Sequence, residues 1–305
     1  MHFYLQDRES SADAVVRIFG ELLGSTQLDM AEPQADPDAA VHAVRKSLKK
    51  MRALLRLVRP AIKVKTFRKA DRAVRDLAHQ LGGARDSAVM LAAFDQLVEH
   101  FSPFLSDAAC VPIRQVLASR YQATIEHHLS SMDYDSIRSQ LDNLESLLKQ
   151  LDLRKFSKEK LLGSVLDTYR QGRDELAALR TDPTTEHGHA LRKQTKYLWY
   201  QLRLLSKSND VQLKKLIQGL NELGEVLGQD HDLAILSDTL KRQPEICCNS
   251  IRSEFVTGLI ETRRVTLLSA ALRMADKIYA QKPKRFLSWI GKLDLTDPPA
   301  AACRT

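Results

Sequence analysis

Leucine-rich segments with apolar residues at positions i, i+3, i+4 and i+7 dominate the chain, and few segments alternate with period two. This spacing places apolar side chains on one face of an α-helix. Short connections between helices favour antiparallel bundles. The pattern predicts an all-α protein, with helices near residues 11–24, 37–59, 65–80, 85–101, 111–131, 134–150, 158–179, 183–207, 211–226, 231–241, 250–280 and 283–291.

Two of the expected helices, at 37–59 and 183–207, carry the same basic motif. Each copy contains H-x-x-R-K-x-x-K followed by a further Arg. The copies are 147 residues apart in a chain of 305, which indicates a duplicated unit and not a local repeat. The matched residues are His42, Arg45, Lys46, Lys49 and Arg56 in the first copy and His189, Arg192, Lys193, Lys196 and Arg203 in the second.

Two further elements recur in the same order around these motifs. The dipeptide Asp-Pro at 36–37 matches 182–183, and Asp with Pro predicts a helix start because Asp caps free N–H groups. Downstream, L-G-x-x-x-D recurs at 81–86 and 227–232. Asp86 and Asp232 are expected near helix starts, where a carboxylate complements the helix dipole. Each could also hold an Arg of the basic helix or take part in catalysis.

The first basic helix separates its charges from its apolar residues. At about 100° per residue, its cations, including Arg52, fall along one side, and Val44, Leu48, Met51 and Leu55 fall on the other. The second copy is arranged alike, although the aromatic residues Tyr197, Trp199 and Tyr200 stand near positions where the first copy has cations.

The charge of the two copies is unequal. Residues 42–86 hold fourteen Lys and Arg against three Asp, a net charge of +11, which exceeds the +8 of the whole chain. Residues 189–232 carry seven Lys and Arg against five Asp and Glu, a net charge of +2. Any basic helix face could instead be an ordinary solvent-exposed surface without a ligand. Like charges at helical spacing repel, however, so the two basic helix faces favour binding of an anionic partner. Because the two copies differ in charge, their faces would form an uneven binding site.

The remaining composition bounds the class of protein. No stretch has the length and apolarity of a membrane-spanning helix, and the N-terminal residues lack the apolar core of a signal peptide. Four Cys show no metal-ligand spacing and are expected to be reduced thiols in a cytoplasmic protein. The apolar pattern breaks at 150–158, between the halves, while 29–36 is expected to be a loop and 293–305 a tail.

The nine His suggest a metal site or a catalytic role. His127-His128, His187-x-His189 and Asp230-His231-Asp232 are the dense spots, and the last could in principle bind a cation. Metal-ligand motifs, a Walker A loop and G-x-S-x-G are absent from the sequence. His42 and His189 could donate to a phosphate oxygen or pack within their own bundle, and both alternatives stay open.

The doubled H-x-x-R-K-x-x-K motif and the L-G-x-x-x-D elements resemble the CHAD family, the conserved histidine α-helical domain, over residues 8–292. The resemblance implies two antiparallel four-helix-bundle halves, 8–150 and 158–292, related by internal pseudo-twofold symmetry around a basic central pore or groove. It also implies binding of inorganic polyphosphate and, in some bacteria, localisation to polyphosphate granules. Some family members carry a triphosphate-tunnel enzyme domain, and nothing in this chain fits one.

From these observations we expect a non-enzymatic, cofactor-free protein that binds inorganic polyphosphate in the cytoplasm and does not enter the membrane. A nucleic-acid-binding module is the alternative, because a pI near 9.3 suits either polyanion. An enzyme acting on phosphoanhydrides ranks third. The expected polyphosphate-binding residues are His42, Arg45, Lys46, Lys49, Lys50, Arg52, Arg56, Arg68, Lys69, His189, Arg192, Lys193, Lys196, Arg203, Lys214 and Lys215.

Overall fold

A computed structural model describes residues 3–6, 9–31, 37–82, 85–103, 105, 107–205, 210–247 and 250–293. These residues contain helices and no strand, which confirms the all-α prediction. The α-helices are α1 (Ser11–Ala31), α2 (Pro37–Val58), α3 (Val64–Gln80), α4 (Arg85–Phe101), α5 (Asp107–Ser130), α6 (Tyr134–Lys149), α7 (Lys158–Thr181), α8 (Thr185–Arg203), α9 (Val211–Arg242), α10 (Ser250–Ile278) and α11 (Pro283–Gly291). Two short 3-10 helices are η1 (Arg59–Ala61) and η2 (Pro244–Cys247).

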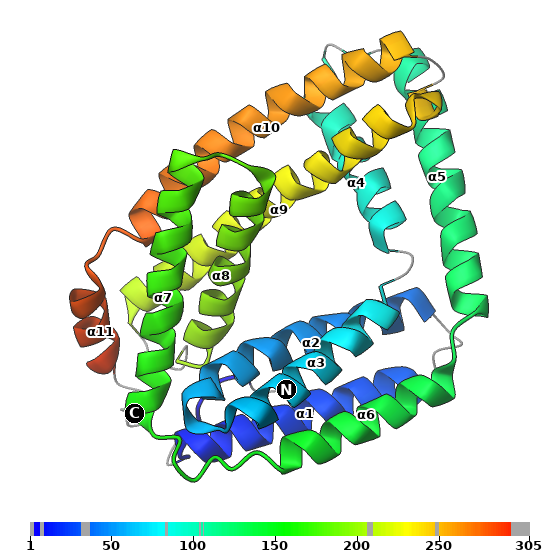
Figure 1. Ribbon diagram of the computed structural model, residues 1–305. Helices are drawn as coiled ribbons and strands as arrows, with labels where there is room; N and C mark the ends of the chain where they lie inside the picture. Colours follow the sequence, from blue (N-terminus) through cyan, green and yellow to red (C-terminus); the bar gives the residue numbers. More distant parts are fainter. Residues whose placement is uncertain are drawn as a thin grey trace, which may run out of the picture.

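Helices α1, α2, α3 and α6 form one four-helix bundle (Figure 1). Helix α2 packs on α1 and α3, and α6 closes the bundle against the same two helices. The apolar side of α2 supplies Val44, Leu48, Met51 and Leu55, each fully buried. The apolar residues of α3 repeat at helical spacing, as the sequence pattern predicts.

Helix α8 packs on both α7 and α9 and, on the outer side, α11 packs on α7. Tyr169 of α7 stacks on Phe286 of α11 with ring centroids 3.9 Å apart. Gly172 lets α10 approach α7, because a Cβ at this position would lie 2.5 Å from the ring of the buried Tyr279. This packing extends the core of the first bundle through α2, which contacts both α7 and α8.

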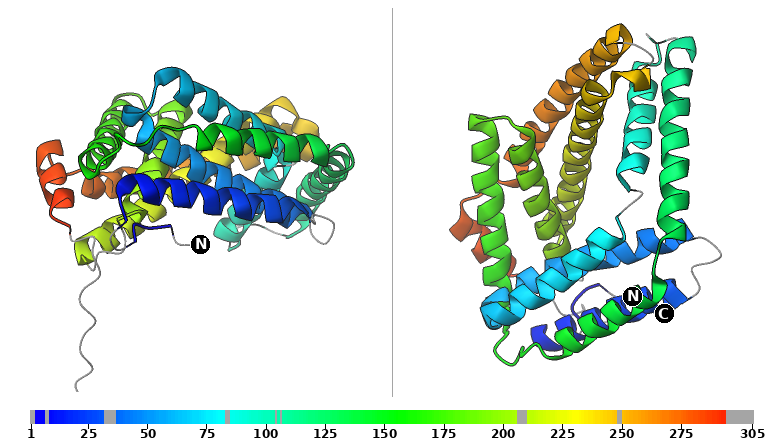
Figure 2. Two further views of the ribbon diagram at one scale, coloured as in Figure 1. Left: turned by 90° about the horizontal axis from the view of Figure 1, so that it is seen from below. Right: turned by 45° about the vertical axis from the view of Figure 1, so that its right-hand side comes forward.

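Helix α4 packs on the far ends of α9 and α10, and α5 packs on α4 and η2, while the end of α5 reaches back to Arg45 of the first bundle (Figure 2). Helices α9 and α10 are 32 and 29 residues long, so their apolar faces extend beyond α7 and α8 and need further partners. A separate buried cluster joins the four helices, formed by Ala93, Phe94, Leu97, Ile113, Leu117, Leu233, Leu236, Leu240, Ile246, Cys247, Val256, Ile260 and Leu267. Helices of the first half therefore pack on helices of the second, across the expected boundary at 150–158. The expected domain limits and the pseudo-twofold relation between the halves stay predictions.

Several expected helix limits differ in the structure. The break expected between 226 and 231 was wrong, because α9 runs through it with Leu223, Leu227, Asp230 and Leu233 buried three or four residues apart. Asp232 therefore lies inside a helix and not at its start. At the start of α8, Thr184 and not Asp182 is the N-cap, since its hydroxyl accepts from the backbone N of His187 at 3.3 Å.

Other expected helix limits also differ in the structure. Helix α1 continues to Ala31, beyond the expected end at 24 and into the expected loop at 29–36, whose residues 32–36 lie outside the described residues. Helix α5 begins at Asp107 and includes Pro112. The expected tail lies outside the described residues from 294 onward.

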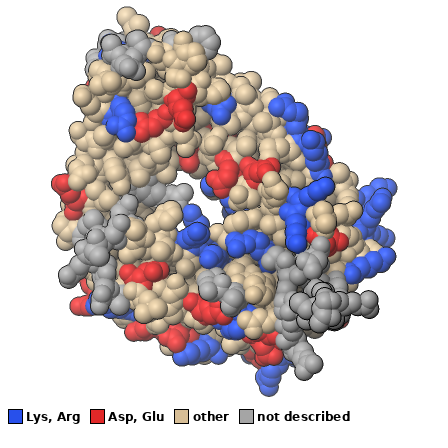
Figure 3. Space-filling view, turned by 180° about the vertical axis from the view of Figure 1, so that it is seen from behind, with Lys and Arg blue, Asp and Glu red and all other residues tan. Residues whose placement is uncertain are grey.

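The helices surround a central opening. In Figure 1 the first bundle lies below it, α7 and α8 on one side, α4 and α5 on the other, and α9 with α10 across the top. Figure 3 shows that an opening remains when side chains are drawn, with Lys and Arg gathered along part of its rim and some Asp and Glu on another part. The expected central pore thus has a physical counterpart next to basic residues.

Candidate anion-binding site

Helix α2 presents its cations on the side opposite its buried residues. His42, Lys46 and Lys49 are exposed, while the side chains of Arg45, Lys50, Arg52 and Arg56 are half-buried. The aliphatic stems of half-buried Arg and Lys cover apolar surface while their charged ends stay accessible. The amphipathic separation expected from the sequence is therefore present in the structure.

Helix α8 separates its buried apolar residues from its cations in the same way as α2. Leu191, Leu198 and Leu202 are fully buried on its inner side. The cations fall on the other side, where His189 and Lys193 are exposed and Arg192, Lys196 and Arg203 are half-buried.

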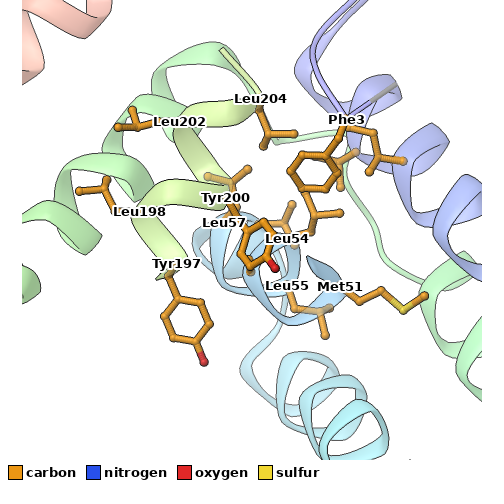
Figure 4. Packing of buried hydrophobic residues seen from close by; sticks show 14 of the residues in the cluster. Phe3, Met51, Leu54, Leu55, Leu57, Tyr197, Leu198, Tyr200, Leu202 and Leu204 are labelled. Carbon is orange, nitrogen blue, oxygen red and sulfur yellow. The ribbon is translucent and has the colours of Figure 1, made fainter. Parts of the chain in front are cut away.

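The two basic helices pack directly on each other. Figure 4 shows Tyr200 of α8 and Phe3 close to Leu54 and Leu57 of α2. This contact brings the end of the α8 stripe to the α2 stripe. Burial lowers the pKa of Lys50, and the nearby charges of Arg203 and Lys46 lower it further. Like charges from both copies of the motif are therefore close enough to repel.

The N-terminal segment places an aromatic ring between these charges. Phe3 lies beneath both Lys50, at 5.8 Å from the ring centroid, and Arg203, at 5.6 Å. The backbone N of Leu5 donates to the carbonyl oxygen of Leu204 at 2.9 Å, which fixes the segment to the end of α8. Ring faces attract cations, so Phe3 offsets part of the repulsion between the two side chains.

Aromatic residues of α8 hold further cations. Trp199 has Arg203 at 4.7 Å and Lys196 at 5.1 Å from its ring centroid, and Arg56 of α2 lies 4.5 Å from the ring centroid of Tyr197. The aromatic residues that stand near cation positions of the first motif thus support the remaining cations. We name Lys50, Arg56, Lys196 and Arg203, with the rings beneath them, the basic junction.

Arg45 and Arg192, which occupy the same place in the two motifs, make equivalent bonds. Nη1 of Arg45 donates to the carbonyl oxygen of Ala78 at 2.5 Å, and Nε of Arg192 donates to that of Gly224 at 3.4 Å. Each acceptor stands four residues before the Gly of a Leu-Gly element. The sequence repeat is therefore also a repeat of side-chain geometry.

Carboxylates compensate part of the positive charge. Arg52 pairs with Asp71 of α3 at 3.1 Å, and Lys196 pairs with Glu225 of α9 at 2.7 Å. Neither Arg56 nor Arg203 forms an ion pair with a carboxylate in the part of the chain that the structure describes. Uncompensated charge therefore remains where α2 meets α8.

Two histidines that the site prediction left out lie beside the motifs. The ring centroids of His231 and His189 are 4.5 Å apart. Partial desolvation is the main cause that lowers the pKa of His189, although much of its side chain is exposed, and His231, Arg192 and Lys193 add to the shift. Burial likewise lowers the pKa of His128, with Arg45 as the next cause. Nothing in one sequence showed that the end of α5 reaches the first motif, but His231 follows the second Leu-Gly pair closely.

The other expected site residues lie apart from the basic junction along the chain. Arg68 and Lys69 are exposed on α3, and Lys214 and Lys215 are exposed near the start of α9. Their part in binding stays a prediction. The side chain of Asp86 lies outside the described residues.

Tyr197 and Tyr200 each retain 8% of their surface exposed, which leaves Trp199 as the partly accessible aromatic residue of α8. None of the described helices combines the length and the apolar composition needed to cross a bilayer.

Comparison with known proteins identifies relatives over most of the chain. Two uncharacterized proteins from two strains of Mycobacterium tuberculosis are each 26% identical over 284 residues, covering 87% of this chain and 54% of theirs. The chain thus spans about half the length of these curated relatives.

Two solved structures share the fold. The CHAD domain from the plant Ricinus communis aligns with a TM-score of 0.59 at 16% identity, covering 97% of this chain and 96% of that one. PptA from Streptomyces chartreusis aligns with a TM-score of 0.62 at 14% identity, covering 90% of this chain and all of that one.

The family profile described as CHAD domain matches residues 20–241. The match includes both basic motifs and both Leu-Gly elements, and it covers well over half of the chain. With its duplicated motif and helical fold, the chain belongs to the CHAD domain family.

Proposed function

We propose that this protein binds inorganic polyphosphate without chemical conversion of the ligand. The observation that carries the proposal is the basic junction, where cations from both copies of the motif converge although Arg56 and Arg203 have no carboxylate partner among the described residues. Convergent, uncompensated cations are unfavourable in the free protein, and a polyanion relieves their repulsion. The resemblance noted from the sequence implies the same ligand.

The mechanism follows from the side chains. Arg offers forked N–H donors that match phosphate oxygens, and Lys offers a mobile point charge. Both kinds are present at the basic junction, and further cations continue along α2 and α8 beyond it. A linear chain of phosphates meets such a stripe at many points, whereas a small anion meets it at few.

A nucleic-acid ligand fits the aromatic residues less well. Single-stranded nucleic acid is held by bases stacked on accessible aromatic rings. Tyr197 and Tyr200 are buried in the contact between α2 and α8, and the ring of Trp199 already has Lys196 and Arg203 over it. The rings at this site support cations, which favours a ligand without bases.

Hydrolysis of phosphoanhydrides would call for carboxylates that hold Mg²⁺ beside a phosphate. Two carboxylates beside the basic helices, Asp71 and Glu225, are each paired with a cation of the site. Such pairing suits them to positioning those side chains. We therefore propose binding alone, in the cytoplasm and at polyphosphate granules in cells that form them.

The test is competition between two polyanions at equal phosphate concentration, long-chain polyphosphate against single-stranded DNA. The comparison is made for the wild type, for Arg56→Ala with Arg203→Ala, and for Arg154→Ala with Arg170→Ala as a control. The control removes the same charge from exposed ion pairs elsewhere. We expect polyphosphate to displace DNA, and only the first double variant to lose this preference. DNA that wins the competition would overturn the proposal, as would phosphate release from polyphosphate with Mg²⁺ present.

A further inference from the structure

The Leu-Gly elements of the repeat lie next to the motif cations. A Cβ at Gly82 would stand 2.9 Å from Nη1 of Arg45, closer than real contacts of this kind. The same Nη1 donates to the carbonyl oxygen of Ala78, one turn earlier along the chain. Glycine thus leaves the backbone bare at the place where the guanidinium rests on it.

The second copy repeats this arrangement. A Cβ at Gly228 would stand 3.0 Å from Nη2 and 3.1 Å from Nε of Arg192. One turn earlier, a Cβ at Gly224 would stand 2.7 Å from Cε and 3.2 Å from Nζ of Lys196. Two adjacent turns of α9 therefore each carry a cation of α8 in the space that a side chain would fill.

These glycines stand where a helix gains nothing from them. Gly224 and Gly228 lie inside the 32-residue helix α9, and glycine weakens a helix interior relative to alanine. At Gly224 and Gly228 the atoms that a Cβ would meet belong to the outer parts of long, flexible side chains, whereas at Gly82 a Cβ would also stand 3.0 Å from the backbone oxygen of His79. Alanine can thus be accommodated if the cation moves, which leaves the fold intact and changes the site.

We propose that Gly82, Gly224 and Gly228 are positioning residues, which let the motif cations lie against the helix backbone with their remaining donors directed to the ligand. The inference rests on the proposed binding of polyphosphate and gives the L-G element of each repeat a role in it. Anchoring restricts each cation before the ligand arrives, so less conformational entropy is lost on binding. A Cβ would remove this preorganisation.

The test uses Gly228→Ala, with Gly219→Ala as the control on the same helix. A Cβ at Gly219 would make an ordinary contact, 3.7 Å from Ile278. We expect Gly228→Ala to weaken binding of long polyphosphate about tenfold, the loss that corresponds to one misplaced charge-assisted hydrogen bond. The melting temperature should not fall, because alanine favours the helix. The control should bind like the wild type.

A double-mutant cycle separates positioning from a purely structural role. If Gly228 acts through Arg192, then Gly228→Ala should cost no further affinity in an Arg192→Ala background. An equal loss in both backgrounds, or wild-type affinity of Gly228→Ala in a protein that binds, would overturn the inference and leave the proposed function standing.

A measurement on the free protein tests the inference even if the wild type does not bind polyphosphate. Nε of Arg192 is bonded to the carbonyl oxygen of Gly224, so its N–H proton should exchange slowly with water by NMR and lose this protection in Gly228→Ala. Absence of polyphosphate binding with this protection present would reject the function alone. Equal exchange in both proteins would reject the positioning role.

Discussion

At the scale of single residues, cations are held near one another by neutral partners. Phe3 lies beneath Lys50 and Arg203, and Trp199 lies beneath Arg203 and Lys196. A cation over a ring gains about 0.5–1 kcal/mol when exposed, without the loss of net charge that a carboxylate brings. Aromatic and carbonyl partners therefore keep the side chains ordered while their charge stays available to an anion.

The stripe of α2 should contribute to binding through side chains that the core does not need. We predict that Arg45→Ala with Lys49→Ala weakens polyphosphate binding strongly, because both side chains lie on the polar side of the helix. The fold should remain, since the buried face of α2 is unchanged. Calorimetric titration and a thermal melt give the two results. A folded double variant with wild-type affinity would show that this stripe is a solvated surface.

Binding should strengthen as the pH falls. Burial and neighbouring cations hold the pKa of His189 below its ordinary value, so the free protein carries the neutral ring near pH 7. A bound phosphate favours the charged ring, so binding takes up protons and affinity should rise from about pH 8 to about pH 5.5. Titrations at constant salt in buffers of different ionisation enthalpy measure this uptake.

Stability of the free protein should change in the opposite sense. A His with a lowered pKa binds fewer protons folded than unfolded, so its contribution to stability is lost as the pH falls through the ordinary value of about 6.5. His189→Gln should flatten both dependences. An affinity that stays constant or falls on acidification would contradict the role of the histidines.

At the residue scale, the sequence predicts the features that one helix determines and misses those that depend on contact between two elements. The cationic and apolar sides of α2 follow from spacing alone. The place of Phe3 does not, because it depends on a backbone bond between Leu5 and Leu204, almost 200 positions apart. His128 was likewise missed, since only the fold brings the end of α5 to Arg45.

At the scale of elements, the sequence pattern located the helices but misjudged one junction. Separate helices were expected at 211–226 and 231–241, with a break around Gly228. Gly and clustered polar residues usually mark a turn. Buried leucines on both sides keep the helix continuous, and the glycines admit cations from α8. In the first half of the chain, the corresponding Leu-Gly pair at 81–82 follows the end of α3, and the next helix is α4.

The two basic helices should contribute unequally. Residues 42–86 carry a net charge of +11 and residues 189–232 a net charge of +2, so the summed field is stronger around α2. We predict that neutralising Arg45, Lys49 and Arg52 costs more affinity than neutralising Arg192, Lys193 and Lys196. The pairing of Arg52 with Asp71 and of Lys196 with Glu225 affects both sets alike. Titrations of the two triple variants at one salt concentration compare them, and equal losses would mean that local geometry outweighs the field.

At the scale of the whole molecule, long helices create the opening. Helices α9 and α10 reach past α7 and α8, and α4 with α5 cover their far ends and return the chain to the first bundle (Figure 1). The sequence predicted amphipathic helices for all four, but each apolar face fits many partners. The choice between packing within a half and packing across halves depends on helix length and on the turn after α3, which apolar periodicity does not encode.

The central claim is that converging cations neutralise many phosphates of one chain at once, and the salt dependence of affinity tests it most directly. For a flexible single chain, log affinity falls with log salt by about 0.7 per phosphate contacted, so roughly four to eight contacts give a slope between about −3 and −6. The measurement is calorimetric titration with long polyphosphate from about 50 to 400 mM salt, where screening changes strongly, with pyrophosphate alongside. We predict a slope in that range and much weaker binding of pyrophosphate. A slope near about −1, or an affinity for pyrophosphate equal to that for long polyphosphate, would contradict a site of converging cations. The basic faces of α2 and α8 would then be ordinary solvated surface.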